Sequence, residues 1–72
     1  MNLTVTEKIK LILIRKNMTM KDLADTIGTS KQNLFGKFKK NNFSEKDLNQ
    51  ISEALNYDYE IVFINRDTGE KI

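Results

Sequence analysis

The sequence predicts a mainly α-helical protein of four to five short helices, followed by a C-terminal β-strand or short hairpin. Apolar residues recur at the three- and four-residue spacing that places them on one face of a helix. Four Thr or Ser residues also stand three positions before an Asp, Glu or Gln, which is the pattern of a helix N-terminal capping box. The segment 57–64 is rich in aromatic and β-branched residues and predicts the strand.

Length and composition narrow the class of protein. The 72 residues suffice for a single domain, 1–72, in which 57–72 is the β segment. Without cysteine or histidine, neither a disulfide framework nor a thiolate or imidazole metal site can form, and we expect no metal and no cofactor. No apolar run is longer than the four residues of Leu11 to Ile14, which is too short to cross a membrane, and we expect a cytoplasmic protein without membrane contact.

Charge is distributed unevenly along the chain. Residues 1–40 carry nine basic and three acidic side chains, a net charge of +6, whereas residues 41–72 carry three basic and seven acidic side chains, a net charge of −4. A basic face offset from an acidic remainder suits binding to a polyanion, because lysines near phosphates release condensed counterions. The alternative is that these lysines are ordinary solvated helix faces.

The first two helices follow from their caps. Thr4 with Glu7 begins the first helix, and Asn17, which tolerates a left-handed conformation, ends it. Thr19 with Asp22 begins the second helix. The expected core residues of the two helices are Val5, Ile9, Ile12, Leu13, Leu23, Ala24 and Ile27. Gly28 then allows the positive φ of a turn.

The next two helices repeat this logic. Thr29 with Gln32 is expected to cap a third helix, which leads into a loop at Asn41 and Asn42. Ser44 with Asp47 caps a fourth helix over residues 45–55, with Asn56 closing it. Its expected core residues are Leu48, Ile51, Ala54 and Leu55, and Phe43 is expected to pack on Leu48 as a hydrophobic staple.

After Asn56 successive side chains alternate between two faces of the predicted strand, and one face carries Tyr57, Tyr59, Ile61 and Phe63. Residues 67–69 are then expected to form a turn into a short returning segment, 70–72. An unpaired apolar edge favours a partner, so we expect antiparallel pairing with a second copy in a homodimer. The residues expected at this dimer interface are Tyr59, Ile61, Val62, Phe63 and Ile64. The alternative is a monomer whose ribbon folds back on its own helices.

Residues 20–40 resemble the helix-turn-helix of the phage-repressor-like (Xre or Cro-like) family of DNA-binding proteins, whose fold is lambda-repressor-like. The matching residues are Leu23 and Ala24 in the first helix, Gly28 in the turn, and Ser30 and Leu34 in the second helix. One position departs: Lys37 stands where the family usually has an aliphatic residue, and we expect Phe38 to fill the core instead.

The resemblance implies which residues meet DNA. In the family, side chains at the start and middle of the second helix contact base edges in the major groove. Gln32 can bond an adenine edge bidentately, and Lys31 can donate to guanine acceptors. The base-contacting residues carried over are Lys31, Gln32, Asn33 and Gly36, and those expected at phosphates are Thr29, Ser30, Lys37, Lys39, Lys40 and Lys21.

Four positions in or beside the second helix of this unit have competing interpretations. Thr29 and Ser30 can be simple caps as well as phosphate ligands. Gly36 suggests close approach to DNA or to another helix, but glycine is also tolerated near a helix end. Phe35 can be exposed and touch a thymine methyl group, although burial in the core is the expectation for a large aromatic side chain.

The resemblance implies a sequence-specific double-stranded DNA-binding protein, a transcriptional regulator acting as a dimer on a palindromic operator. The alternative is a protein-interaction or antitoxin-like module whose C-terminal strand pairs with a partner protein. We do not expect an enzyme, because the sequence has no His or Cys and no Gly-rich phosphate loop.

Overall fold

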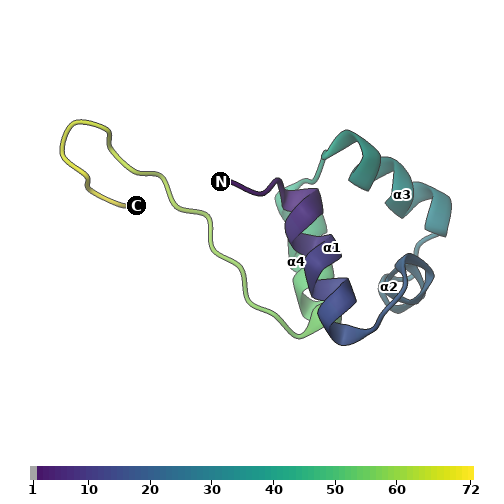
Figure 1. Cartoon of the computed structure of the whole chain (residues 1–72). Coiled ribbons are helices and arrows are strands. Elements are labelled where there is room, and N and C mark those ends of the chain that lie inside the picture. The colour runs from purple at the N-terminus through teal and green to yellow at the C-terminus, as the bar shows by residue number, and fades with distance from the viewer. Residues whose placement is uncertain (1) are drawn as a thin grey trace.

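A computed structural model describes residues 2–72 and is mainly helical, with 58% of these residues in four helices. These are α1 (Val5–Lys16), α2 (Met20–Ile27), α3 (Lys31–Lys40) and α4 (Glu45–Leu55). In Figure 1, α1 lies in front of α4 in the centre of the helical body, while α2 and α3 lie to one side of this pair. The C-terminal segment leaves the end of α4 and projects away from the helices.

Capping boxes begin three of the helices, as predicted. Thr4, Thr19 and Ser44 each accept a hydrogen bond from the backbone N–H three residues on, and Glu7, Asp22 and Asp47 accept one from the cap's own N–H. The prediction for α3 was wrong by one residue. Its N-cap is Ser30, whose Oγ accepts from the N–H of Asn33 at 3.1 Å, and the expected box between Thr29 and Gln32 is therefore not the cap.

All four helices end on a residue in the left-handed region. Asn17, Asn41 and Asn56 have φ of 55°, 50° and 58°, and Gly28 has φ of 88°. Asn and Gly reach this conformation at low cost, and the following N–H groups can then bond carbonyls of the last helical turn. Asn17 ends α1 two residues before the N-cap of α2, and Gly28 ends α2 two residues before the N-cap of α3. The α2–α3 connection is therefore only Gly28, Thr29 and Ser30.

The core is built from two residues of each helix. The buried side chains are Ile9 and Leu13 of α1, Leu23 and Ala24 of α2, Leu34 and Phe38 of α3, and Ile51 and Leu55 of α4. The predicted substitution of Phe38 for the missing aliphatic residue at position 37 is confirmed, since Phe38 is only 3% exposed. Val5 was wrongly assigned to the core and is exposed at the first turn of α1.

Phe43 covers the end of the core in an unpredicted way. Its ring packs edge-to-face on Phe38, with the ring centroids 5.4 Å apart and the planes at 74°. The loop before α4 is thereby held against the last turn of α3. The sequence predicts Leu48, and not Phe38, as the partner of Phe43.

A polar contact ties the C-terminal end of α3 to the first turn of α1. The hydroxyl of Thr6 donates to the carbonyl of Phe38 at 2.8 Å, and the Thr6 N–H donates to Oδ1 of Asn41 at 3.0 Å. The first N–H groups of a helix and the last carbonyls lack partners within their own helix. Thr6 and Asn41 therefore satisfy the free ends of two helices at once and fix the position of α3.

The expected β-strand over residues 57–64 does not form in the described part of the chain. Residues 63–72 instead make a narrow hairpin-like loop, with an isolated antiparallel bridge between Ile64 and Lys71 and reciprocal backbone hydrogen bonds of 2.9 Å between Phe63 and Ile72. Gly69, with φ of 79°, makes the turn. The physical reason is that a strand requires a neighbour, and in a single copy residues 57–62 have no backbone to pair with.

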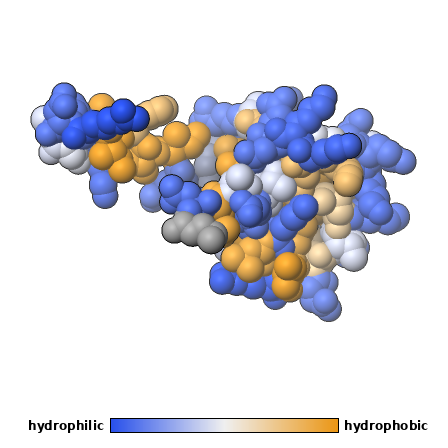
Figure 2. All heavy atoms as spheres, turned by 45° about the horizontal axis from the view of Figure 1, so that its top comes forward, coloured by the Kyte–Doolittle hydropathy of each residue, from blue (hydrophilic) through white to orange (hydrophobic). Residues whose placement is uncertain are grey.

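The projecting segment gives the molecule an elongated shape, with extents of 43 × 22 × 22 Å. Figure 2 shows apolar side chains along this projection, ending in a hydrophilic tip. The segment starts on the helical body: Tyr59 donates its hydroxyl to Oδ1 of Asn49 on α4 at 2.6 Å, and the Lys16 ammonium lies 5.9 Å from the centre of the Tyr57 ring. None of the helices over residues 2–72 combines the length and hydrophobicity needed to span a bilayer.

Candidate nucleic-acid interface

Helix α3 is anchored by one face and leaves the opposite face open. Leu34 and Phe38, four residues apart, hold it to the core with 3% exposure each. At 100° per residue, the side facing away from this pair is centred on Gln32 and Gly36. The ten residues of α3 include four lysines and no acidic residue, so the open face is positively charged.

The predicted base-contacting residues lie on or beside this face. Lys31, Gln32 and Asn33 form the exposed first turn of α3, and Gly36 is partly exposed one turn later. Lys39 and Lys40, expected at phosphates, are exposed at the C-terminal end of the same helix. A shallow hollow on this surface is lined by Gln32, Asn33, Gly36, Lys37, Lys40 and Asn42.

Thr29 and Ser30 occupy the turn before α3 and differ in role. The Ser30 hydroxyl oxygen accepts the Asn33 N–H as the cap, which leaves its own O–H free to donate. Thr29 is half-buried, and its backbone N–H donates to the Ala24 carbonyl at 3.0 Å, which closes α2. Ser30 is therefore the better placed of the two for an incoming phosphate.

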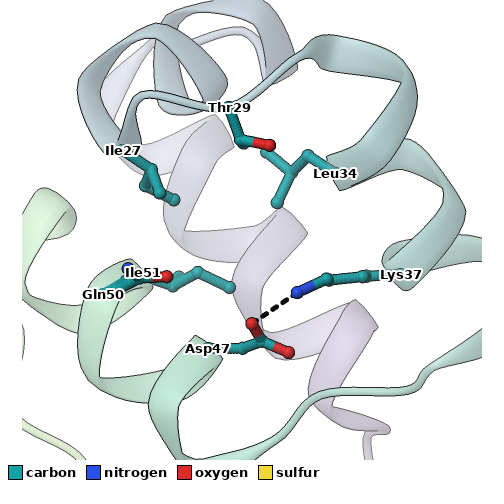
Figure 3. Close-up of a pocket in the computed structure, with 7 residues that line it drawn as sticks. All are labelled: Ile27, Thr29, Leu34, Lys37, Asp47, Gln50 and Ile51. Atoms are coloured by element: carbon teal, nitrogen blue, oxygen red, sulfur yellow. Dashed lines mark hydrogen bonds and ion pairs between the residues drawn. The ribbon is translucent and has the colours of Figure 1, made fainter.

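Lys37 points sideways from α3 and is engaged within the protein. Its ammonium forms an ion pair with Oδ1 of Asp47, the capping-box carboxylate of α4 (Figure 3). The Lys37 ammonium and the Ser44 N–H hold the pKa of the Asp47 carboxyl below its ordinary value. The pair closes one side of a cavity of about 60 Å³ between the α2–α3 turn, α3 and α4. This role of the lysine was not predicted from the sequence.

Lys21 is likewise paired, on the surface of α2. Its ammonium lies 3.1 Å from Oδ2 of Asp25, one turn on, and both side chains are more than 60% exposed. Such an exposed pair within one helix is weak and readily exchanged for another anion. Lys21 therefore differs from Lys37, whose partner belongs to another helix and is largely covered.

Phe35 was expected in the core, and that expectation was wrong. The side chain is 50% exposed and lines a surface hollow together with Lys31, Gln32, Gly36 and Lys39. The sequence contained a signal for this position, because Leu34 and Phe38 already form the buried pair and Phe35 is rotated by 100° from Leu34. The size of the ring favoured the core, but its angle on the helix decides its exposure.

Gly36 has no packing role among the residues that the structure describes. Its φ is not in the left-handed region, and a methyl group added at its α-carbon would meet nothing within 4 Å. The alternative that another helix of this chain approaches Gly36 closely is therefore wrong. The fold would accept alanine at this position.

The residues expected at a dimer interface divide into two groups. Tyr59 is bound to α4 through its hydroxyl. The other four, Ile61, Val62, Phe63 and Ile64, are between 46% and 74% exposed on the projection. Four consecutive large apolar residues thus face solvent in the single chain.

Comparisons with known proteins give no match: no family model fits the chain, and neither a curated protein nor a solved structure resembles it significantly. Within residues 2–72 the acidic side chains also form no group of three or more that could hold a metal ion.

Proposed function

We propose that the protein binds double-stranded DNA with sequence specificity and regulates transcription. The observation that carries the proposal is the open face of α3, which combines exposed amide side chains with lysines and has no acidic residue. Amides and lysines are the groups that read base edges in the major groove, which is wide enough to admit a helix. The resemblance of residues 20–40 to the phage-repressor-like helix-turn-helix supports the same interpretation.

The roles within the interface follow from position. Gln32 and Asn33 contact base edges, and Lys31 donates to guanine acceptors from the first turn. Lys39 and Lys40 bind phosphates at the other end of α3, and the Ser30 hydroxyl binds one at the N-terminus. Lys37 contributes less, because DNA must compete with Asp47 for its ammonium.

The projecting segment pairs with that of a second copy in this proposal. Residues 58–62 make no backbone hydrogen bond in the described chain, and residues 61–64 expose four apolar side chains. Strand addition covers this arrangement. A two-fold dimer would present two α3 helices to successive major grooves about 34 Å apart, and the operator would be palindromic.

A titration of labelled duplex against the protein tests DNA binding. We expect the affinity for a random-sequence duplex to fall steeply as the salt concentration rises. We also expect selection from a random pool to yield a palindromic duplex that the protein binds more tightly.

Gln32→Ala should relax the base preference at one position per half-site, whereas Lys39→Ala and Lys40→Ala should weaken binding to all sequences alike and reduce its salt dependence. Affinity that does not change with salt would contradict the proposal.

Sedimentation tests the dimer separately. Val62→Pro removes a backbone donor from the centre of the segment and should yield a monomer of 8.4 kDa, while the control Val62→Thr should leave the dimer intact. A wild-type protein that sediments as a monomer at micromolar concentration would contradict pairing of the projections.

A second function is favoured by the same exposed segment. The projection carries Asp58 and Glu60 beside its apolar residues and could add a strand to the sheet of another protein, as an antitoxin-like module does. A single stoichiometric protein partner whose capture is lost in Val62→Pro, with DNA binding dependent on that partner, would support this function over self-pairing.

A further inference from the structure

Two features of α3 work against folding and lie side by side. Phe35 exposes half of a large apolar ring, and Gly36 occupies a helix interior where glycine lowers stability by about 1 kcal/mol relative to alanine. Among residues 2–72, Phe35 belongs neither to the core nor to the side chains packed against it, and a side chain at Gly36 would meet open space. An exposed aromatic residue alone is ordinary, but its pairing with an unneeded glycine calls for a common cause.

The surroundings indicate the chemistry of what covers them. Phe35 and Gly36 line the same hollow as Lys31, Gln32 and Lys39, so any ligand reaching the ring also meets two ammonium groups. A purely apolar protein surface would leave these charges desolvated and unpaired, which is costly. The occupant is therefore both anionic and locally apolar.

We infer that Phe35 contacts the C5-methyl group of a thymine in the major groove, and that the missing side chain of Gly36 lets α3 approach the base edge closely enough for this contact. The inference rests on the proposed DNA binding and adds a specificity-determining residue to it. The thymine methyl group is the apolar feature of the major-groove edge, and an aromatic side chain is a suitable partner for it. The lysines on either side meet the phosphates or guanine acceptors of the same groove.

The test replaces thymine by deoxyuridine, one position at a time, in the duplex recovered by selection. This change removes only the methyl group. For the wild-type protein we expect one thymine per half-site at which the change weakens binding about fourfold, the effect of one buried methyl-sized group. Phe35→Ala should bind thymine and uracil duplexes equally at that position.

Ile14→Ala is the matched control. Ile14 is also an exposed large apolar residue, at 75%, but it lies on α1 away from the hollow. This variant should keep the fourfold preference for thymine. If Phe35→Ala retained the preference, or if no thymine mattered to the wild-type protein, the inference would be overturned.

Gly36→Ala tests the close approach independently. Because the added methyl group meets nothing in the free protein, the urea midpoint should rise, while affinity for the selected duplex should fall roughly tenfold, as when a methyl group is forced into a tight contact. Unchanged affinity would overturn the close approach.

The outcomes separate this inference from the proposed function. A wild-type protein without salt-sensitive duplex binding overturns both. Salt-sensitive binding without any effect of uracil overturns the thymine contact alone. If Phe35→Ala instead dissociates the dimer in sedimentation and leaves the uracil effect unchanged, the ring is a protein contact and the inference fails.

Discussion

At the scale of single residues, the ion pair between Lys37 and Asp47 determines which lysines are available to a ligand. Asp47 accepts the Ser44 N–H and also holds the Lys37 ammonium, so one carboxylate caps α4 and joins it to α3. Lys39 and Lys40 have no such acidic partner among the described residues. The positive potential of α3 therefore comes mainly from its two ends.

Releasing Lys37 should strengthen DNA binding. Asp47→Asn keeps an acceptor for the Ser44 N–H but removes the charge that holds the ammonium, so the salt dependence should steepen by about 0.9 in log–log slope for one additional phosphate contact. Glu53→Gln, also on α4, is the control for net charge and should leave the slope unchanged. Equal slopes for the two variants would show that Lys37 stays away from phosphates.

The same carboxylate should make stability depend on pH. The pKa of Asp47 is lowered in the folded protein, so its contribution is complete above its ordinary value of 3.8 and is lost as the pH falls through the lowered value. Asp47→Asn should therefore reduce the free energy of unfolding by less than about 1 kcal/mol at neutral pH. Urea unfolding followed by circular dichroism should show that the difference in unfolding free energy between variant and wild type closes as the pH falls below 3.8. A gap that persists in acid would contradict this cause.

The register of the α3 cap gives a further prediction. Ser30→Ala should lower the free energy of unfolding by about 1 kcal/mol, because the Asn33 N–H loses its acceptor. Thr29→Ala should cost less, since Thr29 contributes its backbone N–H and not its hydroxyl to closing α2. Urea denaturation of the two variants compares them directly, and a larger loss in Thr29→Ala would place the cap one residue earlier.

At the scale of helices, the contact from Thr6 to the end of α3 decides how rigidly the candidate interface is held. Thr6→Val keeps the shape of the side chain but removes the donor to the Phe38 carbonyl, which should cost about 1 kcal/mol. Thr6→Ser retains the hydroxyl and is the control. Amide hydrogen exchange should accelerate in the last turn of α3 for the valine variant alone, and equal exchange in both would show that the core suffices to hold α3.

The helices could be predicted because their signals are local. The boxes at Thr4, Thr19 and Ser44 lie within four residues of sequence, and they set the starts of three helices correctly. At α3 two adjacent hydroxyl residues compete, and nothing local distinguishes Thr29 from Ser30 as the cap.

The features that escaped prediction depend on groups that are distant in the sequence or on a backbone neighbour that residues 57–62 lack. The partner of Lys37 is ten residues away on another helix, and the Thr6–Asn41 contact spans 35 residues. The alternation at 57–64 is a real strand pattern, but a strand also needs a backbone to pair with, which a single copy does not supply. Phe35 was misplaced for a different reason, because its size outweighed its angle on the helix.

At the scale of the whole molecule, the division between basic and acidic residues follows the division between the first three helices and the rest of the chain. The basic half of the chain forms α1 to α3, and the acidic half forms α4 and the projection, which extends to the side of the helical body opposite α2 and α3 in Figure 1. A dimer joined through the projections would therefore keep both α3 faces free. Acidic surface on α4 and the projection would also disfavour DNA binding at those two parts of the molecule.

The most direct test of the central claim, that the open face of α3 is the DNA-binding surface, is a titration of isotope-labelled protein with duplex DNA followed by backbone amide chemical shifts. We expect the largest shift changes in Ser30 to Lys40, with smaller changes in α2 and little change in α4. Changes concentrated on α1, α4 or the projection, with α3 unaffected, would contradict the account.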